Sequence, residues 1–238
     1  MTDLRDIWVY LAANPLLNLT LAAYRAGYLL YRRQRFNPLF NPVLIAVAII
    51  VTILIATGTT YQTYFQGAQF VHFLLGPATV ALAVPLYRQV ERVRRSGLAI
   101  LVSLLVGSLT AALSAIGIVW LLGGGRDSIL SIAPKSVTAP VAMGIAEQLG
   151  GPPSLTAVLV ILTGILGAML GPPLLNGLGI KDWAARGLAI GVASHGIGTA
   201  RALQVNEIAG AFAGLGMGLN ALATSILVAL WHLLSGGS

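Results

Sequence analysis

The sequence predicts an all-α polytopic membrane protein with about seven to eight transmembrane segments, two of them broken or re-entrant helices at the centre. Hydrophobic residues make up 57% of the chain and charged residues only 9%, and the mean hydropathy is +0.86. A soluble domain carries about 25% charged residues, so this chain has too few to cover its surface in water. The apolar runs are long and continuous, which argues against an outer-membrane barrel, whose strands alternate.

Apolar runs of spanning length follow one another along the chain. In order they cover residues 7–30, 42–56, 70–87, 97–122, 155–175 and 208–234. Residues 57–69 are polar and aromatic and suit the membrane interface, while prolines predict a kink near Pro15 and a helix start at Pro42. We expect one transmembrane domain over residues 1–234, followed by a flexible tail, residues 235–238, with the composition of a linker or cloning remnant.

Two basic clusters predict the orientation of the chain. Residues 32–35 and 88–95 each follow an apolar run, and two spans separate them, so both are expected on the cytoplasmic side of the inner (plasma) membrane. The N-terminus is then outside, while hydropathy leaves the side of the C-terminus open. The net charge of +7 lies in these short clusters and not in a basic domain, so the expected partner is the lipid bilayer and not nucleic acid.

The chain also shows a weak internal repeat. A shift of 57 residues places residues 78–87 on 135–144, and a shift of 60 places 136–151 on 196–211. The candidate repeat units are residues 70–123, 129–176 and 184–234, each a broken polar segment followed by a smooth apolar span. Transporter sites form between such repeats, so we expect an elevator-like or crossed-helix transporter bundle.

No catalytic or metal-binding constellation stands out, so we expect no enzyme, no cofactor and no metal. The three histidines are not spaced as metal ligands, and the chain has no cysteine. The glycines at 123–125 lack the lysine and serine of a phosphate loop.

The first polar break lies in residues 132–143 (IAPKSVTAPVAM). Ser136 and Thr138 stand between Pro134 and Pro140, where freed backbone amides and hydroxyls could hold a small carboxylate, and Lys135 could add a full charge. The alternative is that both hydroxyls only bond backbone freed by the prolines and that Lys135 snorkels to the surface. Thr79 matches this break under the shift of 57 residues and is a weaker candidate.

The second polar break lies in residues 193–203 (ASHGIGTARAL). His195 could carry a proton or bond substrate, Ser194 and Thr199 could donate hydrogen bonds, and Arg201 could clamp a carboxylate. A packed histidine and an arginine at an interface remain the alternative. Glu147 and Glu207 are the carboxylates within apolar segments, and with His195 they are the proton-coupling candidates, unless they simply lie at helix ends.

These motifs resemble the LrgB/CidB family, with a similarity that extends over residues 16–234. It is carried by residues 134–140 (PKSVTAP), 150–151 (GG), 194–200 (SHGIGTA) and 76–87 (GPATVALAVPLY). Arg201 departs from the family pattern, in which a small or apolar residue is expected.

The resemblance implies a transporter of small monocarboxylates such as glycolate, glycerate or pyruvate, since the plant relative is a plastid glycolate/glycerate translocator. Proton coupling and a homodimer are expected with it. The alternative is an antiholin-like regulator of murein hydrolase export and cell lysis that acts with a small LrgA/CidA-type membrane partner.

Overall fold

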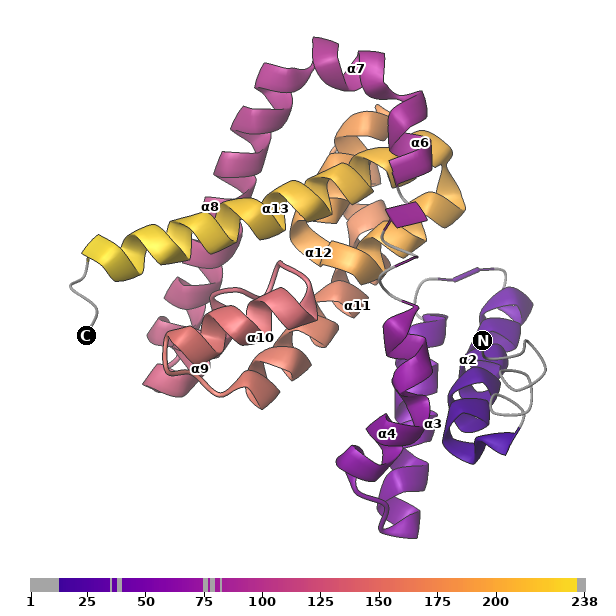
Figure 1. Cartoon of the computed structure of the whole chain (residues 1–238). Helices are drawn as coiled ribbons and strands as arrows, with labels where there is room; N and C mark the ends of the chain where they lie inside the picture. Colours follow the sequence, from indigo (N-terminus) through magenta and orange to yellow (C-terminus); the bar gives the residue numbers. More distant parts are fainter. Residues whose placement is uncertain are drawn as a thin grey trace, which may run out of the picture. The chain divides into compact units, whose positions relative to one another are not determined.

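The computed structural model describes residues 13–34, 36–37, 40–74, 77, 80–81 and 83–234 (Figure 1). All regular elements within these residues are α-helices, which confirms the predicted all-α class. By its internal contacts the chain divides into two compact units, Met1–Ala81 and Leu82–Ser238. The predictions for Thr79 and for the tail, residues 235–238, lie outside the described residues.

The first unit holds three helices, α2 (Pro15–Arg33), α3 (Pro42–Thr57) and α4 (Tyr61–Phe73). Asn14 caps α2 by accepting from the amides of Leu16 and Leu17 at 3.1 Å, and its Nδ2 donates to the carbonyl of Gly67 on α4 at 2.8 Å. Pro15 begins α2 directly after Asn14, and Asn14 separates it from the helical Ala13, so the interruption lies where a kink was predicted.

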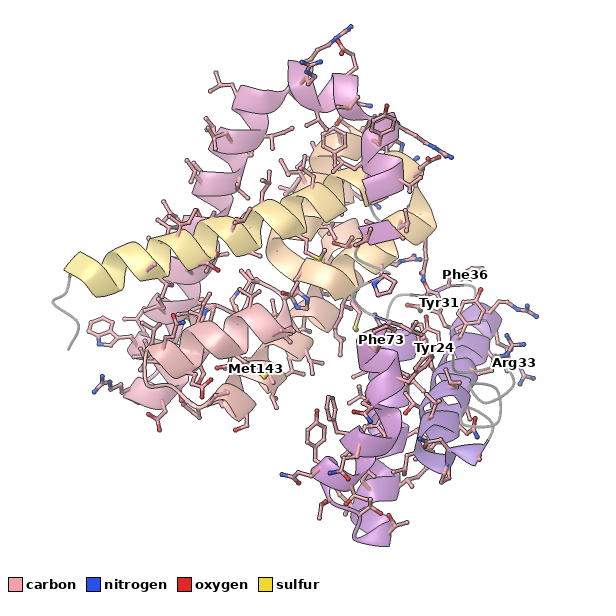
Figure 2. The ribbon with its side chains drawn as sticks, in the orientation of Figure 1. Tyr24, Tyr31, Arg33, Phe36, Phe73 and Met143 are labelled. Carbon is pink, nitrogen blue, oxygen red and sulfur yellow. The ribbon has the colours of Figure 1, made fainter. Side chains whose placement is uncertain are left out.

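Helix α3 begins as predicted, since Asn41 caps it and Pro42 occupies its first position. Aromatic side chains make further contacts within this unit. Tyr64 of α4 lies 2.8 Å from the hydroxyl of Thr20 on α2. Figure 2 shows Tyr31 and Phe36 together at the end of α2, where their rings meet edge to face at 5.3 Å.

The second unit contains the remaining described helices. They are α6 (Ala83–Arg88), α7 (Val90–Arg95), α8 (Gly97–Leu121), α9 (Arg126–Ile132), α10 (Ala139–Gln148), α11 (Pro153–Gly177), α12 (Trp183–Val205) and α13 (Glu207–Leu234). Three are long and apolar enough to cross a membrane: α8, α11 and the part of α13 from Glu207 to Ala229. They match the predicted spans 97–122, 155–175 and 208–234.

The predicted span over residues 70–87 does not form as one helix in the described residues. Helix α4 ends at Phe73 and the short α6 begins at Ala83. The sequence Gly76-Pro77 lies between these two helices, and a proline with a preceding glycine disfavours a continuous helix.

Helix α12 reverses its direction at His195, whose backbone has φ 41° and ψ −135°. A Cβ added to Gly198 would lie 2.9 Å from Cγ2 of Ile190, although eight residues of straight helix would separate them by about 12 Å. The two halves of α12, residues 183–194 and 196–205, therefore pack against each other.

The first half of α12 runs parallel to α13 at very close range. Gly187 lies against the backbone of Ala209 and Gly191 against the backbone of Ala213, so both contacts advance by four residues. Figure 1 shows α13 in yellow as one continuous helix beside α12 in orange. Small residues let these backbones meet, as is common for helices packed in lipid.

The chain also turns back between α9 and α10. After α9 it passes through residues 133–138 and returns along α10. A Cβ on Gly151, just beyond α10, would lie 2.8 Å from Cβ of Leu130 on α9. The second unit thus contains two loop-backs, each followed by a long apolar helix, α11 or α13.

Helices α6 and α7 lie beside the starts of α12 and α13. Arg88 forms a salt bridge with Glu207, the first residue of α13, at 3.0 Å, and Arg92 forms one with Asp182 at 2.5 Å. Asp182 also caps α12 by accepting from the amide of Ala185 at 2.9 Å. The basic segment and both helix starts therefore share one end of the unit.

The two roles of Asp182 can be separated by substitution. Asp182→Ala removes the cap and the ion pair, so we expect it to lower stability by about 1 kcal/mol, the usual cost of a lost N-cap. Asp182→Asn keeps a capping oxygen and loses only an exposed ion pair, which contributes little. Thermal melting in detergent measures both, with Glu91→Gln as the control for a lost exposed pair. Equal losses from the two Asp182 variants would contradict the capping role.

Candidate functional site

The first break comprises residues 133–138 and consists of two tight turns. The amide of Lys135 donates to the carbonyl of Ile132 and that of Val137 to the carbonyl of Pro134, both at 3.1 Å. Ser136 is buried, and the half-buried Lys135 donates from Nζ to its hydroxyl at 3.3 Å. Thr138 ends the break, and its side chain makes no capping bond to α10.

The second break is His195 itself, which is buried against α11. Its Nε2 lies 2.8 Å from the carbonyl oxygen of Val160. Gly164, one turn further along α11, makes room for the ring, because a Cβ there would stand 2.7 Å from the imidazole Cε1. The hydroxyl of Thr199 donates to the carbonyl of His195 at 2.7 Å, which satisfies backbone next to the reversal.

Ser194 is the neighbouring hydroxyl and is almost fully buried, with 1% of its surface exposed. It packs against α11 at Gly167, whose missing side chain leaves the necessary space. Its Oγ has no hydrogen-bond partner within the described part of the chain. Buried hydroxyls usually have a hydrogen-bond partner, so Ser194 is an exception at this site.

Asn220 of α13 joins the two breaks. Its Nδ2 donates to the carbonyl of Ser136 at 3.0 Å and to that of Val192, three residues before the second break, at 3.1 Å. The hydroxyl of Ser108 on α8 donates to its Oδ1. All of these groups are buried, so the breaks meet in the interior of the unit.

The predicted site residues divide into three groups. Lys135 donates to Ser136, and Asn220 links the carbonyl of Ser136 to that of Val192, three residues before His195. Thr138, Ser194 and Thr199 are neighbours of these residues along the chain. Three other residues lie elsewhere, namely Arg201, Glu147 and Glu207.

The two glutamates are exposed at helix ends. Glu147 lies near the C-terminal end of α10, while Glu207 starts α13 and is paired with Arg88. Neither reaches the breaks. In the described ranges no three acidic or histidine side chains gather as metal ligands.

Arg201 lines a separate cavity of about 50 Å³ between α11 and the two halves of α12. Arg186 also lines this cavity, donates to the carbonyl of Ile180 at 2.8 Å, and lies over the Trp183 ring. Arg201 follows the reversal by six residues and is carried away from the first break for that reason.

The sequence prediction missed Asn220 and Ser108. A signal for the first was present, because Asn220 is the one asparagine in the apolar run 208–234. Amide side chains within spans commonly bond neighbouring helices. Ser108 gave no comparable signal, since small hydroxyl residues recur along α8 and most only help packing.

Three helices of spanning length, with a buried polar centre where two broken segments meet, define a polytopic helical membrane protein. The chain belongs to the LrgB-like family, whose family model matches residues 20–233.

Named relatives align over most of the chain. Holin-like protein CidB of Staphylococcus epidermidis (strain ATCC 35984) is 34% identical over 94% of this chain and 98% of its own length. Holin-like protein CidB of Staphylococcus aureus (strain Mu50) is 33% identical with the same coverage. Uncharacterized protein YxaC of Bacillus subtilis (strain 168) is 39% identical over 90% of this chain and 95% of its own. No solved structure matches the chain.

Proposed function

We propose that this chain is a holin-like membrane protein that regulates murein hydrolase export and cell lysis together with a small LrgA/CidA-type membrane partner. The names of the two staphylococcal relatives support this function, because each aligns with 94% of the chain. The proposed role is not enzymatic and requires no cofactor.

This proposal is tested in a Staphylococcus epidermidis strain that lacks its own CidB. A plasmid carrying the chain is expected to restore the parental rate of lysis, measured by turbidity, and the parental murein hydrolase activity in the medium. The empty plasmid is the control. An unaltered deletion phenotype, at a membrane level of the chain equal to that of a plasmid-borne CidB that complements, would contradict the proposal.

A second function, transport of a small monocarboxylate, is favoured by the meeting of the two breaks. Ser108 and Asn220 lie near the middle of α8 and α13, so breaks bonded to them would lie near the bilayer midplane. Carrier sites are built there from interrupted helices, because only protein-lined interiors tolerate irregular backbone at that depth.

The groups at the breaks suit a glycolate, glycerate or pyruvate anion. The ammonium of Lys135 would attract the carboxylate, and the buried hydroxyl of Ser194 would donate to it. His195 would exchange a proton during the transport cycle. Arg201, in its separate cavity, has no part in this arrangement.

Uptake into proteoliposomes tests the carrier. Labelled glycolate and pyruvate are expected to enter vesicles that contain the chain. Ser136→Ala and His195→Ala are expected to slow entry about tenfold or more, the scale of a lost polar contact in a dry site. Ser225→Ala, which removes a hydroxyl bonded only within α13, is the matched control. Equal uptake by the unchanged chain and all three variants would contradict the assignment of the anion site to the breaks.

The salt bridges at the starts of α12 and α13 allow the predicted orientation to be extended to these two helices. With residues 88–95 in the cytoplasm, both helices would begin there, and α13 would end outside the cell. The first break would then enter the inner membrane from outside and the second from inside. A homodimer remains a prediction.

A reporter fusion tests this orientation. Alkaline phosphatase fused after Leu234 is expected to be active and green fluorescent protein at that position dark. A fusion after Arg95 is expected to give the opposite result. A fluorescent fusion after Leu234 would place the end of α13 in the cytoplasm and contradict the orientation.

A further inference from the structure

We infer that Asn220 is a positioning residue that ties the first and second breaks together at the centre of the second unit. Its one amide nitrogen donates to the carbonyl of Ser136 in the first break at 3.0 Å and to the carbonyl of Val192, three residues before the second break, at 3.1 Å. Ser108 donates to the amide oxygen, which fixes the nitrogen toward the two carbonyls. Asn220 is 1% exposed, so water does not compete for these bonds.

Both carbonyls need a partner from outside their own helix. In an unbroken α12 the carbonyl of Val192 would accept from the amide of residue 196, but the reversal at His195 removes that geometry. Ser136 lies in a segment without helical bonds of its own. An unpaired buried carbonyl is costly, most of all in an apolar surrounding, so Asn220 removes a penalty at each break.

The contact made by Asn220 has a counterpart in the other candidate repeat, residues 129–176. The shift of 60 residues that aligns the repeat places Val160 on Asn220 and Lys135 on His195. The carbonyl of Val160 on α11 bonds the His195 imidazole of the second break, while Asn220 of α13 bonds the first break. Each break is thus bonded by the long helix that follows the other break.

The two candidate repeats, residues 129–176 and 184–234, also run in opposite directions. Helix α11 ends at Gly177, a few residues before Asp182, which is paired with α7. Helix α13 begins at the same end, where Glu207 is paired with Arg88. One candidate repeat is therefore inverted relative to the other, and Asn220 lies where the two repeats cross.

The consequence is a defined local effect of substitution. Asn220→Leu removes all three hydrogen bonds and keeps the number and branching of the side-chain heavy atoms. Asn220→Asp keeps an acceptor for Ser108 but loses both donated bonds and places carboxylate oxygens against two carbonyls. In both variants the breaks are expected to separate while the surrounding helices stay packed.

The separation can be measured with thiol probes, because the chain contains no cysteine. Val137→Cys reports on the first break and Val192→Cys on the second, and both side chains are buried. In the otherwise unchanged chain a membrane-permeant maleimide is expected to label both positions slowly. Asn220→Leu and Asn220→Asp are expected to raise both rates about tenfold or more, as the buried segments open locally.

Two controls make the result specific. Ala115→Cys, buried in α8 about two turns beyond Ser108, should stay slow in every background. Ser108→Ala leaves both donated bonds of Asn220 in place and should raise labelling at the breaks much less. Unchanged labelling at 137 and 192 would overturn the inference, and so would an equal rise at 115, since that would indicate general unfolding.

Only the transport readout of this inference rests on the proposed carrier function. If the chain is a carrier, the Asn220 variants should lower its maximal uptake rate more than its apparent substrate affinity, since Asn220 positions the breaks without forming part of the anion site. Loss of the carrier function with labelling as expected would leave Asn220 as the tie between the breaks. The two failures are therefore distinguishable.

Discussion

Gly191→Ala is expected to be among the most destabilising single substitutions in the second unit. A Cβ at this position would overlap the carbonyl oxygen of Ala213 and stand 2.7 Å from its Cα and 2.8 Å from its carbonyl carbon. Both partners are backbone atoms of long helices and cannot rotate away. We expect a loss of about 3 kcal/mol, the upper end for overpacking in a tight interior, because α12 and α13 would have to separate along their shared face.

Thermal melting of the purified protein in detergent measures this loss. Gly218→Ala is the matched control, because Gly218 lies within α13 with no atom inside 4 Å of an added Cβ. That control should keep or slightly raise the melting temperature, since alanine favours a helix over glycine by about 1 kcal/mol. Equal melting temperatures for Gly191→Ala and the parent would mean that the two backbones are not in contact.

The long helices could be predicted from the sequence because their signals are local. Continuous apolar runs set α8, α11 and α13, and the Gly/Pro-rich turns between them mark their ends within a few residues. Asn41-Pro42 likewise predicted the start of α3. At Pro15 the same dipeptide predicted a kink, and the structure has an interruption there, with Asn14 between helical Ala13 and the start of α2.

The existence of both breaks could be predicted, but the way the chain turns at them could not. In the second polar segment, residues 193–203, Gly196 and Gly198 are the residues suited to a positive φ. The reversal instead occurs at His195, which is held by the carbonyl of Val160, a residue 35 positions earlier. A contact of that range depends on the tertiary arrangement and leaves no local pattern.

The composition of the site shows the same limit. Lys135, Ser136 and His195 were grouped because polar residues in apolar segments tend to meet. That grouping stays a prediction, although Asn220 bonds the carbonyl of Ser136 and that of Val192, three residues before His195. Arg201 was grouped with them because it lies in the same polar segment as His195 and could clamp a carboxylate. The reversal places it in the cavity with Arg186. Asn220 could join the site only once α13 was placed beside both breaks.

The backbone conformation at His195 leads to the second large expected effect. At this position glycine should be more stable than alanine, the reverse of their order in a helix. Within a helix, glycine is less stable than alanine by about 1 kcal/mol. At φ 41° any residue with a Cβ is strained, typically by about 1–3 kcal/mol, and glycine is not. Both His195→Ala and His195→Gly lose the imidazole bond to Val160 and the packing of the ring against Gly164. We therefore expect His195→Gly to melt at a higher temperature than His195→Ala.

Position 193 provides the matched comparison, because Ala193 is exposed and lies in the helical part of α12. Ala193→Gly should lower the melting temperature, in the ordinary order of the two residues. If glycine were also the less stable residue at position 195, the reversal would not lie at His195. If the order is inverted only there, the strain belongs to the break, and the packing of the imidazole against α11 holds the backbone in that strained conformation.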